Sequence, residues 1–154
     1  MRNELTKKIK LARRFTLIGV VLVTCCGLAL LSIFSSRGGQ TLTIGTNRLH
    51  IETANTVQEK RSGLCCRNSL SPDSGMLFIY DAPAIHKFWM KNTRIPLDMY
   101  WIDSGRKIVY IQRNVKPNTY PKTFGPDIPA QYILETNAGY AETHTIQVGD
   151  TAQF

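Results

Sequence analysis

The sequence offers few of the residues on which catalytic and metal sites are commonly built. Its three histidines, His50, His86 and His144, lie at no spacing typical of metal ligands, which argues against a zinc site. It contains neither a G-x-S-x-G nucleophile elbow nor a glycine-rich phosphate loop. We therefore expect no metal and no cofactor. Whether the protein is an enzyme stays open, with a non-enzyme favoured.

Cysteine is scarce as well, and the four cysteines form two adjacent pairs, of which Cys65 and Cys66 lie outside the hydrophobic segment described below. Adjacent cysteines would close a strained ring, so no ordinary disulfide framework can be drawn and the domain is expected to rely on its core. The favoured interpretation is that Cys65 serves as a small apolar side chain and that Cys66 is incidental, and a redox role is the weaker alternative. Arg61 and Arg67 would favour the thiolate, but the predicted helix C-terminus nearby opposes it.

The net charge of +8 resides mainly in the N-terminal tail. Six basic residues and one acidic residue precede position 15, and 6 − 1 gives +5. From Ser35 onward the chain has 13 basic and 10 acidic residues, a net of 13 − 10 = +3. A nucleic-acid-binding domain is expected to carry a basic stripe, and no such stripe is seen, so we expect no nucleic-acid partner.

Residues 15–34, FTLIGVVLVTCCGLALLSIF, form a run of twenty residues without a charge. A helix of about this length crosses the ~30 Å hydrocarbon core of a bilayer. The basic tail, residues 1–14, is expected to stay in the cytoplasm. The run therefore predicts a single-pass anchor in the cytoplasmic membrane, with an extracytoplasmic (periplasmic) domain at 42–154 after a linker at 35–41. The alternatives are a cleaved signal, which would give a secreted protein, and a lipoprotein modified at Cys25.

The start of the domain has local signals for a hairpin and a helix. Residues 42–51 alternate apolar and polar side chains around a Gly-Thr-Asn turn, which is typical of a hairpin. Thr56 and Glu59 have the spacing of a capping box. We expect a short helix from there to about Cys66, with Val57, Leu64 and Cys65 on its buried side.

The rest of the chain reads mostly as strand. Strands are expected at residues 76–80, 85–91, 97–102, 107–112 and 132–135, with one helical turn within 138–144 and a last strand at the C-terminus. Residues 114–130 form a loop with four prolines, and long irregular loops are usually functional or mobile. This pattern predicts a mainly β, α+β fold, a single small β-barrel-like domain with one or two short helices.

Several short motifs occur in a distinctive order. They are Gly63-Leu64 followed by Arg67, Gly75-Met76-Leu77-Phe78, the FWMKNT stretch at 88–93, the IPLD stretch at 95–98, Leu134-Glu135 with Ala138-Gly139, and Gly149-Asp150. In these motifs the chain from 42 to 154 resembles the family of domain of unknown function 192 (DUF192), small bacterial and archaeal proteins that often carry a signal or anchor segment. The resemblance implies a compact β-rich fold and no established activity. Cys65 departs from the family, which usually has methionine there.

The FWMKNT stretch supplies the first candidate site residues. On a strand, Phe88 and Met90 would face one way and Trp89 and Lys91 the other. If the first pair belongs to the core, Trp89 and Lys91 mark a half-exposed surface with an apolar plate and a cation, suited to stacking on a sugar or an aromatic ring. The alternative, which we weight somewhat more heavily, is that Trp89 belongs to a second layer of core.

Asp98 lies within an apolar run and is expected to be partly buried, where a carboxylate needs a partner. Arg67 and Lys91 are the candidate partners, and Glu135 in Tyr-Ile-Leu-Glu is a second acid. These four residues could orient a ligand. They could also form a structural ion-pair network, which is the favoured interpretation.

Three functions remain open. The first is a binding module for a small polar ligand or an envelope partner, built on a site that the proline-rich loop covers and whose candidate residues are Arg67, Trp89, Lys91, Asn92, Asp98 and Glu135. The second is an enzyme with Asp98 or Glu135 as acid or base and with Lys91 or Arg67 stabilising negative charge. The third is an assembly protein of the envelope. The oligomeric state is not determined by the sequence.

The predicted span has a direct test. We expect the full-length protein to stay in the membrane fraction after a high-salt or alkaline wash, because salt weakens attachment through a basic surface but does not extract a spanning helix. The measurement is fractionation followed by immunoblotting, together with protease access to the C-terminus from outside the cell. Release as a soluble protein that begins near Arg37 would show a cleaved signal instead.

Overall fold

The computed structural model describes residues 39–154, which form one compact unit. The predicted tail, the predicted span and most of the predicted linker lie outside the described residues. Strand β1 begins at Gln40, two residues before the predicted start of the domain. Within residues 39–154, no helix combines the length and the hydropathy needed to cross a bilayer.

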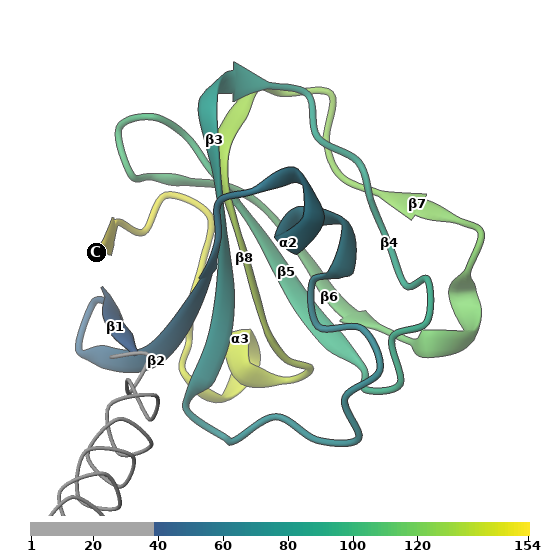
Figure 1. Ribbon diagram of the computed structural model, residues 1–154. Coiled ribbons are helices and arrows are strands. Elements are labelled where there is room, and N and C mark those ends of the chain that lie inside the picture. Colours follow the sequence, from purple (N-terminus) through teal and green to yellow (C-terminus); the bar gives the residue numbers. More distant parts are fainter. Residues whose placement is uncertain (1–38) are drawn as a thin grey trace, which may run out of the picture. The chain divides into compact units, whose positions relative to one another are not determined.

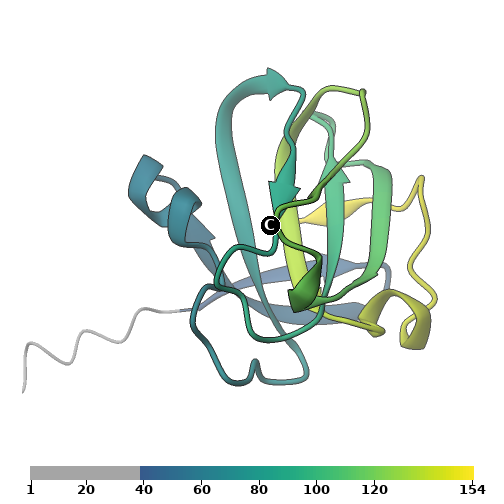
Figure 2. The same ribbon diagram turned by 90° about the vertical axis from the view of Figure 1, so that its right-hand side faces the viewer.

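The domain is mainly β and of the α+β type, with a seven-stranded sheet that curls into a half-barrel (Figures 1 and 2). The strand order is β6-β5-β8-β3-β2-β1-β9. These strands are β1 (Gln40–Ile44), β2 (Asn47–Ala54), β3 (Ser74–Ala84), β5 (Leu97–Ile102), β6 (Ile108–Val115), β8 (Ala130–Asn137) and β9 (Ala152–Gln153). A separate ribbon pairs β4 (Phe88–Trp89) with β7 (Thr123–Phe124). The helices are α2 (Val57–Ser62), α3 (Tyr140–Thr143) and the 3-10 turn η1 (Pro117–Thr119).

Most neighbouring strands are antiparallel, and the exception is β2 with β3, which run parallel. Parallel strands need a crossover connection, and α2 lies within it. The capping box predicted for this helix is confirmed: Thr56 accepts a hydrogen bond from the Glu59 amide, and the Glu59 carboxylate accepts one from the Thr56 amide. The helix is shorter than predicted and ends at Ser62.

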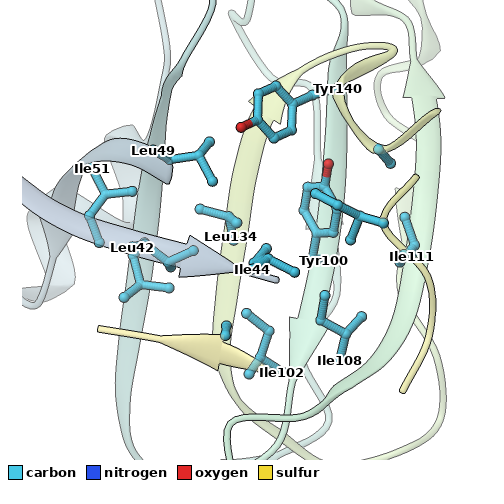
Figure 3. Packing of buried hydrophobic residues seen from close by; sticks show 14 residues of the cluster. Leu42, Ile44, Leu49, Ile51, Tyr100, Ile102, Ile108, Ile111, Leu134 and Tyr140 are labelled. Carbon is cyan, nitrogen blue, oxygen red and sulfur yellow. The ribbon is translucent and has the colours of Figure 1, made fainter. Parts of the chain in front are cut away.

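Both faces of the sheet are covered, so the domain has two hydrophobic clusters. One contains Leu42, Leu49 and Tyr100 (Figure 3), and the other contains Phe78 and Trp101. All six residues of β5 are buried, because successive side chains enter opposite clusters. The predicted burial of Leu64 and Met90 is confirmed, whereas Val57 is 81% exposed, so its expected core position was wrong.

Most other predicted elements are present with shifted ends. The hairpin of β1 and β2 and the strand at 97–102 are confirmed. The strand expected at 85–91 is reduced to the two residues of β4, because it pairs with two-residue β7 rather than with the main sheet. The loop expected at 114–130 contains η1 and β7.

Cys65 and Cys66 are joined by a disulfide, which corrects the expectation that they stay unpaired and serve as a small apolar side chain and an incidental one. The bond links neighbours in the chain, so it does not connect distant parts of the domain. Cohesion therefore still comes from the two clusters. The amide of Cys66 donates to the carbonyl of Asn92 at 2.9 Å, which ties this turn to the segment after β4.

Asp98 on β5 is fully buried and bonds two backbone amides. Its Oδ1 accepts from Asn114 at 2.8 Å, at a bulge where β6 has one extra residue opposite β5. Its Oδ2 accepts from Ala141 at 2.9 Å, in the first turn of α3. Gly139, the residue before that helix, has no side chain to cap it, so Asp98 caps α3 from a distant strand.

This arrangement corrects the expected pairing of Asp98 with Arg67 or Lys91. The guanidinium of Arg67 contacts Glu52 instead, through two hydrogen bonds, one of them 2.9 Å long. A buried carboxylate can be satisfied by amides as well as by a cation, and no sequence pattern marks which of the two it meets.

We expect Asp98→Ala to lower the free energy of unfolding by about 2–6 kcal/mol, because it leaves two buried amides without an acceptor at roughly 1–3 kcal/mol each. Chemical unfolding of the full chain in detergent micelles, followed by tryptophan fluorescence, measures this. The matched control is Asp103→Ala, which removes an exposed bond to the Lys107 amide and should cost no more than about 1 kcal/mol. Equal costs for the two variants would contradict the assigned role.

Candidate functional site

A recess of about 140 Å³ opens between α2, β3, β4 and β8, on the side where Figure 1 shows α2 and β4. Its lining comprises Lys60, Arg61, Ser62, Gly63, Leu64, Phe78, Tyr80, Lys87, Phe88, Trp89, Lys91, Thr93 and Glu135. Eight of these residues come from the motifs that carry the family resemblance. Segments far apart in the sequence therefore converge on one concave site.

Glu135 lines the recess as a buried acid. On β8 it stands opposite Met76 of β3 on one side and Met99 of β5 on the other. Only 5% of its surface is exposed, and no hydrogen bond or ion pair joins its carboxyl group to any residue of the 39–154 unit. Burial disfavours the charged form and raises the pKa of Glu135 to about 8, so the group is mainly protonated at neutral pH.

Gly63 keeps the space beside Glu135 open. It follows the last residue of α2 with a φ of 50°, a conformation that glycine adopts readily. A Cβ placed there would lie 3.2 Å from Phe78 and 3.8 Å from the Glu135 carboxylate. A side chain at position 63 would therefore crowd the acid and the ring beside it.

Four cationic side chains surround the acid. Lys60 and Arg61 come from the last turn of α2, while Lys87 and Lys91 flank β4. The ammonium group of Lys87 is already engaged, since it lies 2.9 Å from the Asp127 carboxylate and donates to two carbonyls. The side chains of Arg61 and Lys91 are exposed and donate no hydrogen bond to another part of residues 39–154. They are therefore the cations most available to a ligand.

Aromatic rings form the walls. Tyr80 is held between two partners, with the Lys60 ammonium 4.4 Å from its ring centre and the His86 ring stacked at 3.6 Å. Trp89 is 49% exposed and stands edge-on to Tyr120 at 6.3 Å. Lys91 lies 6.0 Å from the Trp89 ring. Trp89 therefore forms a half-exposed surface beside a cation. The sequence analysis gave this arrangement less weight than a position of Trp89 in the core.

The structure gathers half of the six predicted site residues. Trp89, Lys91 and Glu135 line the recess, whereas Asp98 and Arg67 do not. Asn92 adopts a positive φ of 58°, and its carbonyl accepts from Cys66, so it shapes the turn after β4 rather than the lining.

The proline-rich loop supports the site from outside. Its strand β7 pairs with β4, Tyr120 contacts Trp89, and Asp127 holds Lys87. None of the lining residues comes from positions 114–130. The loop therefore does not cover the site as expected, and it packs against β4 instead.

Sequence reasoning missed Lys60, Arg61, Lys87 and Tyr80 as site residues. A usable signal was present for two of them, because the capping box placed Lys60 and Arg61 in the last turn of a short helix just before Gly63.

Within residues 39–154, no group of three or more His, Cys, Asp or Glu side chains could hold a metal ion.

Comparison with known proteins gives a family and a fold. A sequence model of the DUF192 family, described as uncharacterised, matches residues 40–154. A crystal structure of a Sinorhizobium meliloti 1021 protein, provisionally described as a transcription regulator, is 32% identical with a TM-score of 0.69, covering 73% of this chain and 89% of that one. A Novosphingobium aromaticivorans DSM 12444 protein of unknown function is 31% identical with a TM-score of 0.71, covering 78% and 89%. No curated protein matches the chain.

The raised pKa of Glu135 makes a stability prediction. The folded state keeps a proton that the unfolded chain releases above its ordinary pKa of 4.5, so stability falls as pH rises from there to about 8. Glu135→Gln mimics the neutral form and should remove this loss, at roughly 1.4 kcal/mol for each pH unit in that window.

Thermal unfolding of the full chain in detergent between about pH 5 and pH 8 checks this. Exposed Glu142→Gln is the matched control and should follow the parent protein. Parallel curves for the parent and Glu135→Gln would mean that the Glu135 carboxyl group is ionised in the folded protein.

Proposed function

Because this chain belongs to the DUF192 family of uncharacterised proteins, we propose a function from the geometry of its own site. The domain is a binding module that holds a small polar ligand of negative charge in the recess between α2 and β4. It does so on the outer face of the cytoplasmic membrane, tethered by the predicted span at residues 15–34.

The observation that carries this proposal is the convergence of motif residues on one concave site. Gly63-Leu64, Phe78, four residues of the FWMKNT stretch and Glu135 lie up to 72 positions apart in the chain, and all of them line the recess. Ligand sites are commonly concave and provided with a few directed polar groups. Arg61 and Lys91 supply charge, Trp89 supplies a stacking surface and Glu135 supplies one polar group beneath them.

The enzyme alternative is less well supported. Paired carboxylates within reach of one ligand would favour acid–base chemistry. Both oxygens of Asp98, however, accept hydrogen bonds from backbone amides away from the recess. Glu135 is the one carboxyl group in the lining. A single buried acid with cations around it fits recognition of an anion more simply than a reaction.

Other partners have less support. Among the large exposed apolar side chains of residues 39–154, Trp89 and Tyr120 contact each other beside the recess, and this pair is smaller than the contiguous patch that a docking surface for an envelope protein needs. A regulatory role on DNA, suggested by the description of the Sinorhizobium protein, would call for a basic stripe, while the net charge from Ser35 onward is 13 − 10 = +3.

The proposal is tested by the small molecules that co-purify with the full-length protein from cell membranes. We expect mass spectrometry of the denatured protein to release an anionic metabolite, and the Arg61→Ala, Lys91→Ala double variant to retain at least about tenfold less of it, since charge-assisted bonds are among the strongest polar contacts. The matched control is the Arg48→Ala, Lys116→Ala double variant, which removes the same charges from exposed positions elsewhere. Equal retention by both double variants would contradict binding in the recess.

A further inference from the structure

We propose that Glu135 acts on the ligand as a neutral hydrogen-bond donor, so that the recess selects small oxyanions, carboxylates or phosphate esters, over amines and zwitterions. This inference rests on the proposed function and specifies its ligand. It starts from the position of Glu135, a residue that is only 5% exposed, whose carboxyl group bonds to no residue of the described unit and which lines the recess between α2 and β4.

The surroundings of Glu135 keep it uncharged. Met76 and Met99 flank it on the sheet, and Leu64 and Phe78 line the same recess. Burial alone accounts for the raised pKa of Glu135, and the four cations of the lining do not offset it. The recess therefore holds a protonated carboxyl group inside and positively charged side chains around it.

A protonated carboxyl group offers one O–H donor, and an oxyanion is the acceptor that matches it best. An O–H group bonded to a negatively charged oxygen makes a short, charge-assisted hydrogen bond. The other oxygens of the same anion remain free to meet Arg61 and Lys91. If Glu135 were ionised, two negative groups would share the recess without a proton between them, and binding would weaken.

An amine fits the recess poorly, even though a buried acid lies beside aromatic rings there. The lining carries four cations against one acid, so a positive ligand meets repulsion at the mouth. The aromatic faces that could attract a cation already have one, with Lys60 4.4 Å from the Tyr80 ring and Lys91 6.0 Å from the Trp89 ring. Binding an amine would also require Glu135 to lose its proton.

The proposal predicts that anion binding depends on pH, and the groups near Glu135 allow this dependence to be assigned to Glu135. Lys60 and Arg61 on α2, with Lys87 and Lys91 around β4, are the charged groups that face it. Burial raises the pKa of Tyr80 and lowers the pKa of His86, so both stay neutral between pH 7 and pH 9. Among these neighbours, Glu135 is then the acid that changes charge near pH 8.

The test uses three probes that share one ring: benzoate, phenyl phosphate and benzylamine. Dissociation constants are measured by tryptophan fluorescence with the full-length protein in lipid nanodiscs. We expect both anions to bind and benzylamine not to, and the tighter anion identifies which oxyanion the site prefers. Between pH 7 and pH 9 the protonated form of Glu135 falls from about nine-tenths to one-tenth of the population. Anion binding should therefore weaken about tenfold.

The Glu135→Gln variant separates this inference from its rivals. Glutamine keeps a donor but cannot ionise, so anion affinity should stay within about threefold of the parent at pH 7 and should not change with pH. Glu142→Gln is the matched control and should keep the parent's pH dependence.

Three results would overturn the inference. Benzylamine binding that Glu135→Gln abolishes would show an ionised acid that pairs with cations. Anion binding to the parent protein that does not change between pH 7 and pH 9 would remove Glu135 from recognition and leave the proposed anion site intact. Failure of both anions to bind the parent at pH 7 would contradict the proposed function as well.

Discussion

The structure depends on the position of strand β8, which is hydrogen-bonded along both edges, to β3 and to β5, while both of its faces are covered. In the middle of such a strand both faces pack against other side chains, so alternate residues enter two different cores. Leu134 enters one cluster and Ile133 enters the other. Glu135 follows the same alternation, and its burial is a direct consequence of where β8 lies.

Two buried carboxyl groups differ in what surrounds them. Asp98 is enclosed by backbone amides and holds β5, the β6 bulge and α3 together. Glu135 has no such partner among the described residues and borders a recess. A buried polar group that is satisfied stabilises the fold, whereas one that borders a recess can be reached by a ligand, as we propose for Glu135.

The remaining parts of the site sit on well-supported elements. A capping box starts α2, Gly63 ends it, and Lys60 and Arg61 are thereby set beside the acid. The ribbon of β4 and β7 places Trp89 and Lys91 opposite them, with Asp127 restraining Lys87. The two similar bacterial structures share this fold, and their descriptions name no ligand, so the chemistry of the lining carries the functional argument.

By itself the sequence determined the mainly β fold class, the hairpin, the capping box, the strand at 97–102 and the family, because alternation, caps and motifs are local signals. It also marked Trp89, Lys91 and Glu135 as candidates. Only the tertiary structure decided that these three meet, that Arg67 pairs with Glu52, and that Asp98 caps α3 instead of binding a cation. Those outcomes depend on which strands pair and in which register, and pairing is set by contacts between residues far apart in the chain.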